Sequence, residues 1–477
     1  MYRFWEKKKF PYIKPVMPFG NVPFTLKRSN AGVHLQTVYT ILLNNNLKYS
    51  GVYMLHLPRI LLTCPKLIEN VLQKDFNYFT DRGFYFNEIH DPLSANLFAL
   101  DGEKWRRVRN KLSSSFTLSK LKVMLPHLRK CGYDLTSAIY SKCKNDGVID
   151  IKDMAMSHNI NVIASCGFGL ECNCFVDNLE FKRQGKKIFD LSSRLRWLKL
   201  LFAFTYMNAA RNLGVTLFDR DTTAFFTNIL KETIKFRREN NITRHDMINS
   251  IIELGNNFDD NEIKQLAAHV FIFFAAGYET TSITLTFCLY ELSINNNLQN
   301  KLRQEIDQVL EKHNGEVNYE ALMDMKYMDQ IVNETLRKYP PLLYITRVCG
   351  KNYPLPNTID IIPKGENVDI SILGLHHNPE YYPDPNKFDP ERFSPCNRHK
   401  ISSTTYMPFG AGPRKCIGMQ FGLVNLKLSL TMLLHRFSFT LNKITKEPLA
   451  YDEFSFTLVP KHEIFLDTKL RSHNFEK

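Results

Sequence analysis

The stretch Phe409-Gly-Ala-Gly-Pro-Arg-Lys-Cys-Ile-Gly418 decides how the rest of the chain is interpreted. It is a glycine-rich loop that places Cys416 directly ahead of an apolar segment, at about residues 417 to 437, which is predicted to be a helix. The positive end of that helix and its unpaired amide N–H groups favour a thiolate at this position. Glycines lack a side chain and so let the backbone lie against a large flat group; those of the loop are Gly410, Gly412 and Gly418.

Two further side chains of the loop suit a bound anion and a shielded sulfur. Arg414 offers a planar, permanently charged fork to an anionic group. Phe409 is placed to cover the sulfur of Cys416 and keep water away from it. The loop alone leaves open a second interpretation, a buried structural cysteine in a glycine-rich turn.

Composition excludes several classes of protein. The chain of 477 residues has no linker, low-complexity run or internal repeat, which predicts one large domain. Its net charge of +14 suits an acidic protein partner or an anionic membrane surface, and no zinc-finger or RNP-type pattern favours nucleic acid. Its ten cysteines are scattered and form no C-x-x-C, so a disulfide scaffold, a zinc ribbon and an iron–sulfur cluster are not indicated. This usage favours a reducing compartment that faces the cytosol.

A second feature is a predicted helix from about residue 261 to 294 whose apolar run is interrupted by Gly277, Glu279 and Thr280. A carboxylate in such surroundings is costly unless it is paired or used. Thr280 can donate back to the carbonyl of Ala276, four residues earlier, which bends and opens a helix. The alternative interpretation is a threonine-rich buried helix whose glutamate reaches solvent. A membrane-spanning helix is a third interpretation, and the charge of Glu279 near the centre of the helix argues against it.

Five motifs in this order resemble those of the cytochrome P-450 family, and the resemblance extends from about Phe24 to the C-terminus. The amino-acid sequences of two loops are similar to those of insect microsomal, xenobiotic-metabolising members. The motifs are W-x-x-x-R at Trp105 and Arg109, A-G-x-E-T-T at residues 276–281, E-x-x-R at Glu334 and Arg337, P-E-R-F at residues 390–393, and the cysteine loop.

The resemblance implies a mainly α fold with a small β region, a triangular helical prism around a buried haem. The implied domains are residues 1–23, a basic patch and proline-rich hinge, and residues 24–477, a single haem domain. The implied cofactor is haem b (iron protoporphyrin IX), with Cys416 as the metal ligand. The other cofactor-binding residues that it implies are Phe409, Gly412, Arg414, Gly418, Trp105, Arg109, Arg347, Arg82 and Ala276. Trp105 is equally typical of a core tryptophan, and Arg82 and Arg347 of ordinary loop arginines.

The implied activity is that of a monooxygenase in which Thr280, with Glu279 behind it, passes protons to bound oxygen. Glu334, Arg337 and Arg392 are implied to form a buried cluster that serves folding and haem retention. Expected substrate contacts are Phe273, Phe274 and Ala275, with residues 86–98, 342–346 and 454–457. Adjacent His376 and His377 cannot point the same way on a helix or strand and are interpreted as structural.

The chain shows no NADPH or flavin module, so electrons are expected from NADPH-cytochrome P-450 reductase, with cytochrome b5 as a further partner. Lys104, Arg107 and Lys111 share a helix face that is either solvated or a dock for the reductase. Expected substrates are lipophilic xenobiotics or endogenous lipids and hormones. The expected location is the cytosolic face of the endoplasmic reticulum membrane, although the sequence starts at the basic patch without an anchor segment.

Two competing functions use the same cysteine. A haem-thiolate isomerase or dehydratase needs no reductase, and such enzymes tend to lose the acid–alcohol pair that is intact here as Glu279 and Thr280. A haem carrier or sensor has no need of a proton relay. The sequence therefore favours monooxygenation.

Overall fold

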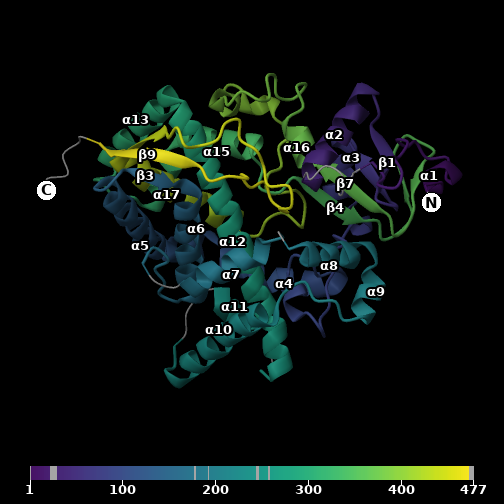
Figure 1. The fold of residues 1–477 in the computed structure, drawn as a ribbon, viewed down its shortest axis with the longest axis horizontal. Coiled ribbons are helices and arrows are strands. Elements are labelled where there is room, and N and C mark those ends of the chain that lie inside the picture. Colours follow the sequence, from purple (N-terminus) through teal and green to yellow (C-terminus); the bar gives the residue numbers. More distant parts are fainter. Residues whose placement is uncertain are drawn as a thin grey trace.

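The computed structural model describes residues 2–21, 30–176, 179–191, 193–242, 247–255 and 258–471. Helices dominate these residues (Figure 1). The predicted mainly α fold with a small β region is confirmed, while the predicted domain boundary at residues 23 and 24 lies outside the described residues. The α-helices are α1 Phe4–Lys7, α2 Ala31–Asn44, α3 Pro65–Glu69, α4 Gly102–Ser113, α5 Leu118–Cys143, α6 Ile151–Val162, α7 Leu179–Phe189, α8 Arg194–Thr205, α9 Met207–Asn212, α10 Arg220–Glu239, α11 Met247–Ile252, α12 Asp260–Ile294, α13 Asn296–Lys312, α14 Tyr319–Asp324, α15 Lys326–Lys338, α16 Ile372–His376 and α17 Met419–Arg436.

Within the described residues the strands form three small sheets. The largest has the order β1-β2-β7-β4, in which β2 and β7 run parallel and the outer pairs run antiparallel. The second has the order β3-β9-β8 and is antiparallel throughout, and the third is the hairpin β5-β6. The bounds are β1 Tyr49–Met54, β2 Leu57–Leu62, β3 Val148–Asp150, β4 Tyr344–Val348, β5 Tyr353–Pro354, β6 Ile361–Ile362, β7 Asn367–Ser371, β8 Phe437–Leu441 and β9 Phe465–Leu470.

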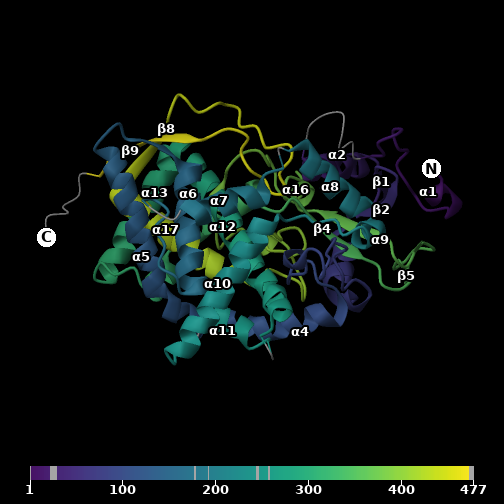
Figure 2. The same cartoon turned by 60° about the horizontal axis from the view of Figure 1, so that its bottom comes forward.

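The two larger sheets lie at opposite ends of the molecule, with the helices between and below them (Figures 1 and 2). Helix α1, at the start of the described chain, lies beside the β1 sheet, and β9 is the last strand before the described chain ends at residue 471 (Figure 1). Trp5 of α1 is fully buried, and its indole N–H donates to the carbonyl of Val52 at 3.2 Å. Tyr12 forms a β-bridge with Gly51, so the start of the predicted hinge lies against β1.

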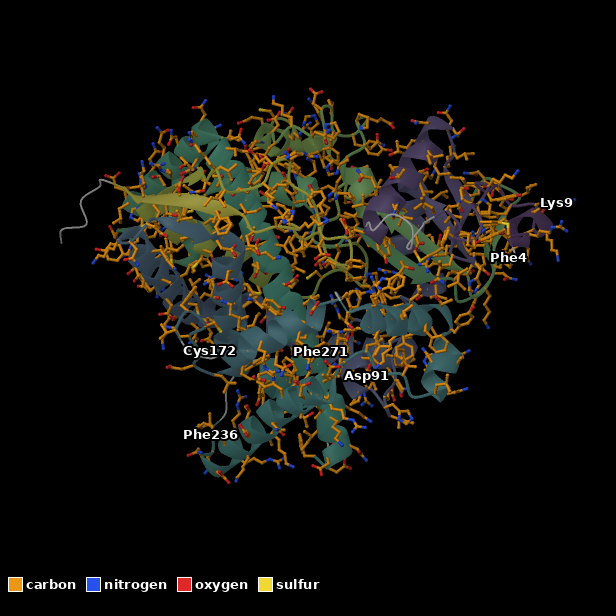
Figure 3. The ribbon with its side chains drawn as sticks, viewed as in Figure 1. Phe4, Lys9, Asp91, Cys172, Phe236 and Phe271 are labelled. Atoms are coloured by element: carbon orange, nitrogen blue, oxygen red, sulfur yellow. The ribbon has the colours of Figure 1, made fainter. Side chains whose placement is uncertain are left out.

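Helix α12 runs through the core and packs against α6, α10, α15 and α17. Asp259 caps it by accepting from the amides of Asn261 and Glu262. Figure 3 shows Phe271 of α12 in the interior, whereas Phe236 lies at the outer end of α10. Among the described residues α12 is the one helix long and apolar enough to cross a membrane, yet 67% of that apolar window is buried inside the protein. Its hydrophobicity is therefore explained by its place in the core.

Candidate functional site

The cysteine loop is held by its own backbone. The amide of Cys416 donates to the carbonyl of Phe409 at 2.9 Å, and the amide of Gly410 donates to the carbonyl of Met407 at 2.9 Å. Helix α17 begins three residues after Cys416, close to the predicted start. The loop thus presents the sulfur at the entry to a helix.

Gly412 is required for a reason that the sequence did not reveal. It has a φ of 71°, and a Cβ at this position would lie 1.7 Å from the carbonyl oxygen of Leu72. Gly412 does not line the cavity described below, unlike Gly410 and Gly418. The predicted contact of Gly412 with a cofactor stays a prediction; in the structure this glycine lets the loop pack against residues 72–73.

A cavity of about 270 Å³ lies between the cysteine loop and α12. Cys416 is exposed to this cavity although it lies deep in the protein. The cavity brings together most of the predicted site residues, from the loop, α4, α12, β4 and the segment before α4. They are Phe409, Arg414, Cys416, Gly418, Trp105, Arg109, Phe273, Ala276, Thr280, Arg347 and Arg82.

The surroundings of Cys416 act on its thiol in opposite directions. Burial raises the pKa of the thiol, while a hydrogen bond with the Gly418 amide and the charges of Arg109 and Arg82 lower the pKa in part. In the protein alone burial prevails, so the expected preference for a thiolate is not met by the helix end alone. A thiol that coordinates a metal cation is deprotonated, so a bound metal would give Cys416 its thiolate form.

Four arginines converge on the cavity: Arg82, Arg109, Arg347 and Arg414. Burial, together with the charge of Arg414, lowers the pKa of Arg347 to about 9, and burial lowers the pKa of Arg414 to about 10. The Nε of Arg347 and the Nη1 of Arg414 are buried without a hydrogen-bond partner. The Nη2 of Arg414 lies 3.9 Å from carboxylate oxygens of Asp81 and Asp101. Buried donors without a partner nevertheless remain on both Arg347 and Arg414, so the site fits a ligand that carries carboxylates on this side.

The rest of the Arg414 side chain is firmly held. Its Nε donates to the carbonyl of Thr80 at 2.7 Å and its Nη2 to that of Leu100 at 2.8 Å. Its guanidinium lies 4.0 Å from the ring centroid of Trp105, so Trp105 is both a buried core residue and part of the cavity wall. Arg82 donates to the carbonyl of Arg414 at 3.0 Å.

Helix α12 presents one face to the cavity. Thr280 Oγ1 donates to the carbonyl of Ala276 at 2.7 Å, as predicted, and the helix remains α-helical through this point. Glu279 does not line the cavity; its carboxylate accepts from Thr457 at 3.4 Å. Burial raises the pKa of Glu279 to about 7. This carboxyl group therefore lies behind the wall and is protonated in part near neutral pH.

Of the three predicted substrate contacts on α12, one lines the cavity. Phe273 lines the cavity, whereas Phe274 and Ala275 are buried in the core on other faces of the helix. The reason is the helical period, which turns successive side chains by about 100°. Phe274 packs instead against Phe226, with ring centroids 5.3 Å apart.

Aromatic side chains close the cavity. Phe84 lies 5.0 Å from Phe98 and 5.9 Å from Phe456 between ring centroids, and Phe116 lies 5.4 Å from Phe273. Phe84 and Phe116 were not predicted to line the cavity. Phe84 stands in a loop that resembles those of the family, but such a resemblance does not show which side chains of the loop face a cavity, and Phe116 stands in no motif. All of these rings except Phe273 come from segments outside α12.

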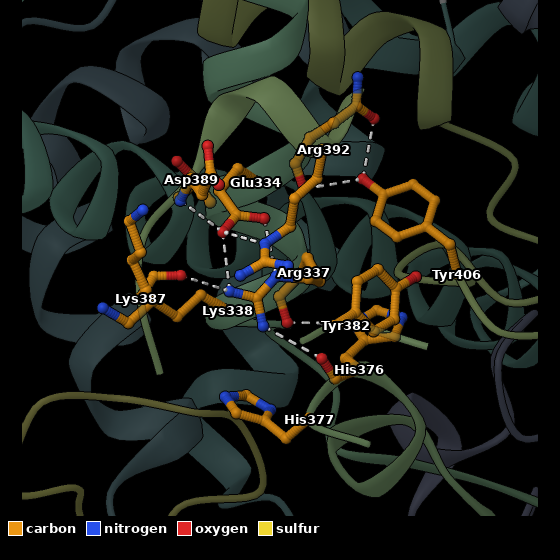
Figure 4. A network of polar contacts seen from close by, with 12 residues as sticks. Glu334, Arg337, Lys338, His376, His377, Tyr382, Lys387, Asp389, Arg392 and Tyr406 are labelled. Carbon is orange, nitrogen blue, oxygen red and sulfur yellow. Dashed lines mark hydrogen bonds and ion pairs between the residues drawn. The ribbon is translucent and has the colours of Figure 1, made fainter. Parts of the chain in front are cut away.

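Outside the cavity, Glu334 and Arg337 form a fully buried pair in α15, with bonds of 2.7 and 2.8 Å between the guanidinium and the carboxylate (Figure 4). Arg392 Nε lies 3.5 Å from Glu334 Oε1, and the amide of Asp389 donates to the same oxygen at 2.8 Å. The predicted proximity of Glu334, Arg337 and Arg392 is thus seen, away from the cavity.

The predicted basic face lies on α4. Arg107 is exposed, Lys104 forms an ion pair with Glu88 at 2.7 Å, and Lys111 donates to the carbonyl of Glu253 at 3.0 Å. Two of its three cations are therefore partly engaged within the protein.

Comparison with known proteins gives concordant matches over nearly the whole chain. The family model described as "Cytochrome P450" matches residues 14–466. The chain is 38% identical to "Probable cytochrome P450 6a14" of Drosophila melanogaster over 98% of this chain and 95% of that protein. It is 35% identical to "Cytochrome P450 6A1" of Musca domestica (98% and 93%) and 37% identical to "Cytochrome P450 6k1" of Blattella germanica (96% and 91%).

Proposed function

Since this chain belongs to the cytochrome P450 family and is a P450 monooxygenase, an oxidoreductase with a haem-iron cofactor, we propose that Cys416 is the protein ligand of a haem b iron and that the enzyme oxygenates lipophilic substrates. One observation carries the proposal. The sulfur of Cys416 faces the same cavity as Thr280 and four arginines, two of which have a buried donor without a hydrogen-bond partner.

Haem iron with a thiolate ligand, when bound, supplies the activation of dioxygen and the transfer of one oxygen atom to substrate. The protein supports it with Arg82, Arg109, Arg347 and Arg414, whose charges suit the propionates. Phe409 and the apolar wall around Cys416 exclude water from the sulfur.

The residues of α12 supply protons. Thr280 Oγ1 lies at the cavity surface, held by Ala276, and hydrogen-bonds to oxygen or water there. Glu279 exchanges protons with the Thr280 side through water, a task suited to a carboxyl group whose pKa burial raises to about 7. Neither a carrier nor a sensor needs these two groups.

The cavity wall suits an apolar substrate. Phe84, Phe98, Phe116, Phe273 and Phe456 contribute aromatic rings, and the charged groups gather at the arginines. This composition fits xenobiotics or endogenous lipids and hormones of low polarity.

Electrons come from NADPH through a separate reductase, NADPH-cytochrome P450 reductase, with cytochrome b5 as a second donor. Arg107, exposed on α4, is the centre of the proposed dock. The enzyme works at the cytosolic face of the endoplasmic reticulum membrane, and apolar side chains on α8 and the following segment support contact with a bilayer. Leu195 is 66%, Leu198 55% and Leu213 72% exposed.

The test compares Cys416→Ser with Cys396→Ser, an exposed cysteine outside the loop. We expect the reduced carbon monoxide complex of the wild type and Cys396→Ser to show the red-shifted Soret band of thiolate ligation, and Cys416→Ser to lose it. Wild-type enzyme with reductase and NADPH is then incubated under isotopically labelled dioxygen with a panel of lipophilic compounds. Labelled oxygen in a product supports monooxygenation; turnover without reductase identifies an isomerase or dehydratase instead.

A further inference from the structure

His376 is buried completely and connects two parts of the protein that are far apart in sequence. It is the last residue of α16, and it lies next to Arg337 of α15, whereas His377 lies apart from the cluster (Figure 4). Its Nδ1 lies 3.2 Å from the carbonyl oxygen of Arg337, and its own carbonyl accepts from Arg337 Nη1 at 3.1 Å. This reciprocal pair ties α16 to α15.

The other ring nitrogen of His376 faces the cysteine loop. The backbone amide of Met407 donates to Nε2 at 3.0 Å. An amide N–H can only donate, so Nε2 carries no proton, and the proton of the neutral ring is on Nδ1, from where it donates to Arg337. Both nitrogens are thus used, and the ring stacks on Tyr406 with centroids 5.4 Å apart.

Met407 connects the contact of His376 to the hydrogen bonds within the cysteine loop. The carbonyl of Met407 accepts from Gly410, and the amide of Cys416 is held by the carbonyl of Phe409. Tyr406, next to Met407, donates to the carbonyl and side-chain oxygens of Asn333 in α15 at 3.1 and 2.8 Å. At the start of the loop, Tyr406 therefore bonds directly to α15, and the Met407 amide is connected to α15 through His376.

We propose that His376 is a positioning residue for Cys416: its two ring nitrogens fix Met407, at the start of the cysteine loop, to the backbone of Arg337. Glu334 fixes the side chain of Arg337 by an ion pair, Arg337 hydrogen-bonds to His376, and His376 accepts from the Met407 amide at the start of the loop. The inference rests on the proposed role of Cys416 as the iron ligand.

The experiment uses holoenzyme and three variants. In His376→Asn the amide reaches the place of Nδ1 but leaves the Met407 amide without an acceptor. In His376→Gln the side-chain oxygen reaches the place of Nε2 and keeps that acceptor. His377→Gln is the control, because Nδ1 of His377 lies 3.1 Å from the carbonyl of Leu373, within its own helix turn.

Hydrogen exchange of the Met407 amide is the first measurement. We expect exchange roughly tenfold faster in His376→Asn, as befits the loss of one buried hydrogen bond, and near the wild-type rate in His376→Gln and His377→Gln. The second measurement is the Soret band of the reduced carbon monoxide complex. We expect His376→Asn to show a weaker red-shifted band, because a part of the protein loses thiolate ligation. An equal effect of His377→Gln, or unchanged exchange in His376→Asn, overturns the proposal.

Two further results keep the outcomes separate. If His376→Asn yields no holoenzyme, hydrogen exchange of the Met407 amide is measured in the wild type. Exchange as fast as that of an unprotected amide overturns the proposal. If the wild type lacks the thiolate band while the Met407 amide is protected, the role of Cys416 fails and the contact of His376 with the loop stands.

Discussion

Thr280 Oγ1 donates a hydrogen bond of 2.7 Å to the carbonyl oxygen of Ala276, and both residues line the cavity that Cys416 faces. The bond fixes the hydroxyl of Thr280 at the cavity surface, because its acceptor is the carbonyl one helical turn earlier. It leaves the oxygen of Thr280 available to accept a second bond from the cavity side.

The first prediction concerns coupling. We expect Thr280→Ala to keep the thiolate Soret band but to consume NADPH with little product, because the hydroxyl that delivers protons is gone. Product formed per NADPH consumed is the measurement. Thr286→Ala is the control, since Thr286 makes the same type of bond, 2.7 Å to the carbonyl of Ser282, away from the cavity. Unchanged coupling in Thr280→Ala would reject the relay.

The second prediction uses two Glu-x-x-Arg pairs with the same spacing. Arg337→Ala leaves the fully buried Glu334 without its main partner, and we expect a loss of about 3–5 kcal/mol in the free energy of unfolding. Arg106→Ala removes the partner of Glu103 from an exposed pair 2.8 Å long, with an expected effect within about 1 kcal/mol. Chemical denaturation followed by circular dichroism compares them. Equal effects would contradict a buried structural role.

The third prediction is a pH dependence of stability. Burial raises the pKa of Glu279 from 4.5 to about 7, so the folded protein keeps a proton that the unfolded chain releases. The unfavourable contribution is absent below pH 4.5 and fully present above pH 7. We therefore expect Glu279→Gln to gain up to about 3 kcal/mol over the wild type as pH rises through this window.

Denaturation midpoints of the two proteins at pH values across that window test it. Glu316→Gln, at an exposed position, is the control. A constant difference between Glu279→Gln and the wild type at every pH would show that burial does not raise this pKa.

The fourth prediction separates two arginines of one sheet. Arg347 on β4 has a buried Nε without a partner, whereas Arg59 on β2 forms a bidentate pair with Asp369 at 2.5 Å. We expect Arg347→Met to weaken haem binding by roughly 10- to 100-fold without destabilising the haem-free protein, since it removes an uncompensated charge. We expect Arg59→Met to cost about 3–5 kcal/mol in stability, because it strands the buried Asp369.

Rates of haem transfer to an acceptor protein, and unfolding of the haem-free protein, measure the two effects. A destabilised haem-free Arg347→Met protein would mean that Arg347 has structural partners of its own.

The sequence predicted those features that depend on local order. The helix at residues 260–294, the bond from Thr280 to Ala276 and the pairing of Glu334 with Arg337 follow from spacings of three and four residues, which a helix brings onto one face. The motif order also indicated that Cys416, Thr280 and the arginines share one site, and the cavity unites them.

The tertiary structure decided what lies opposite each of these residues. The helical period lets only one of Phe273, Phe274 and Ala275 face the cavity, and the packing of segments remote in sequence decided that it is Phe273. Gly412 turned out to lie against the carbonyl of Leu72, another contact between segments remote in sequence. The same holds for His376, whose residue type indicated only a structural histidine. Its contact with Met407 exists because α15, α16 and the cysteine loop pack together, and no local pattern encodes the distance between elements that only the folded core brings into contact.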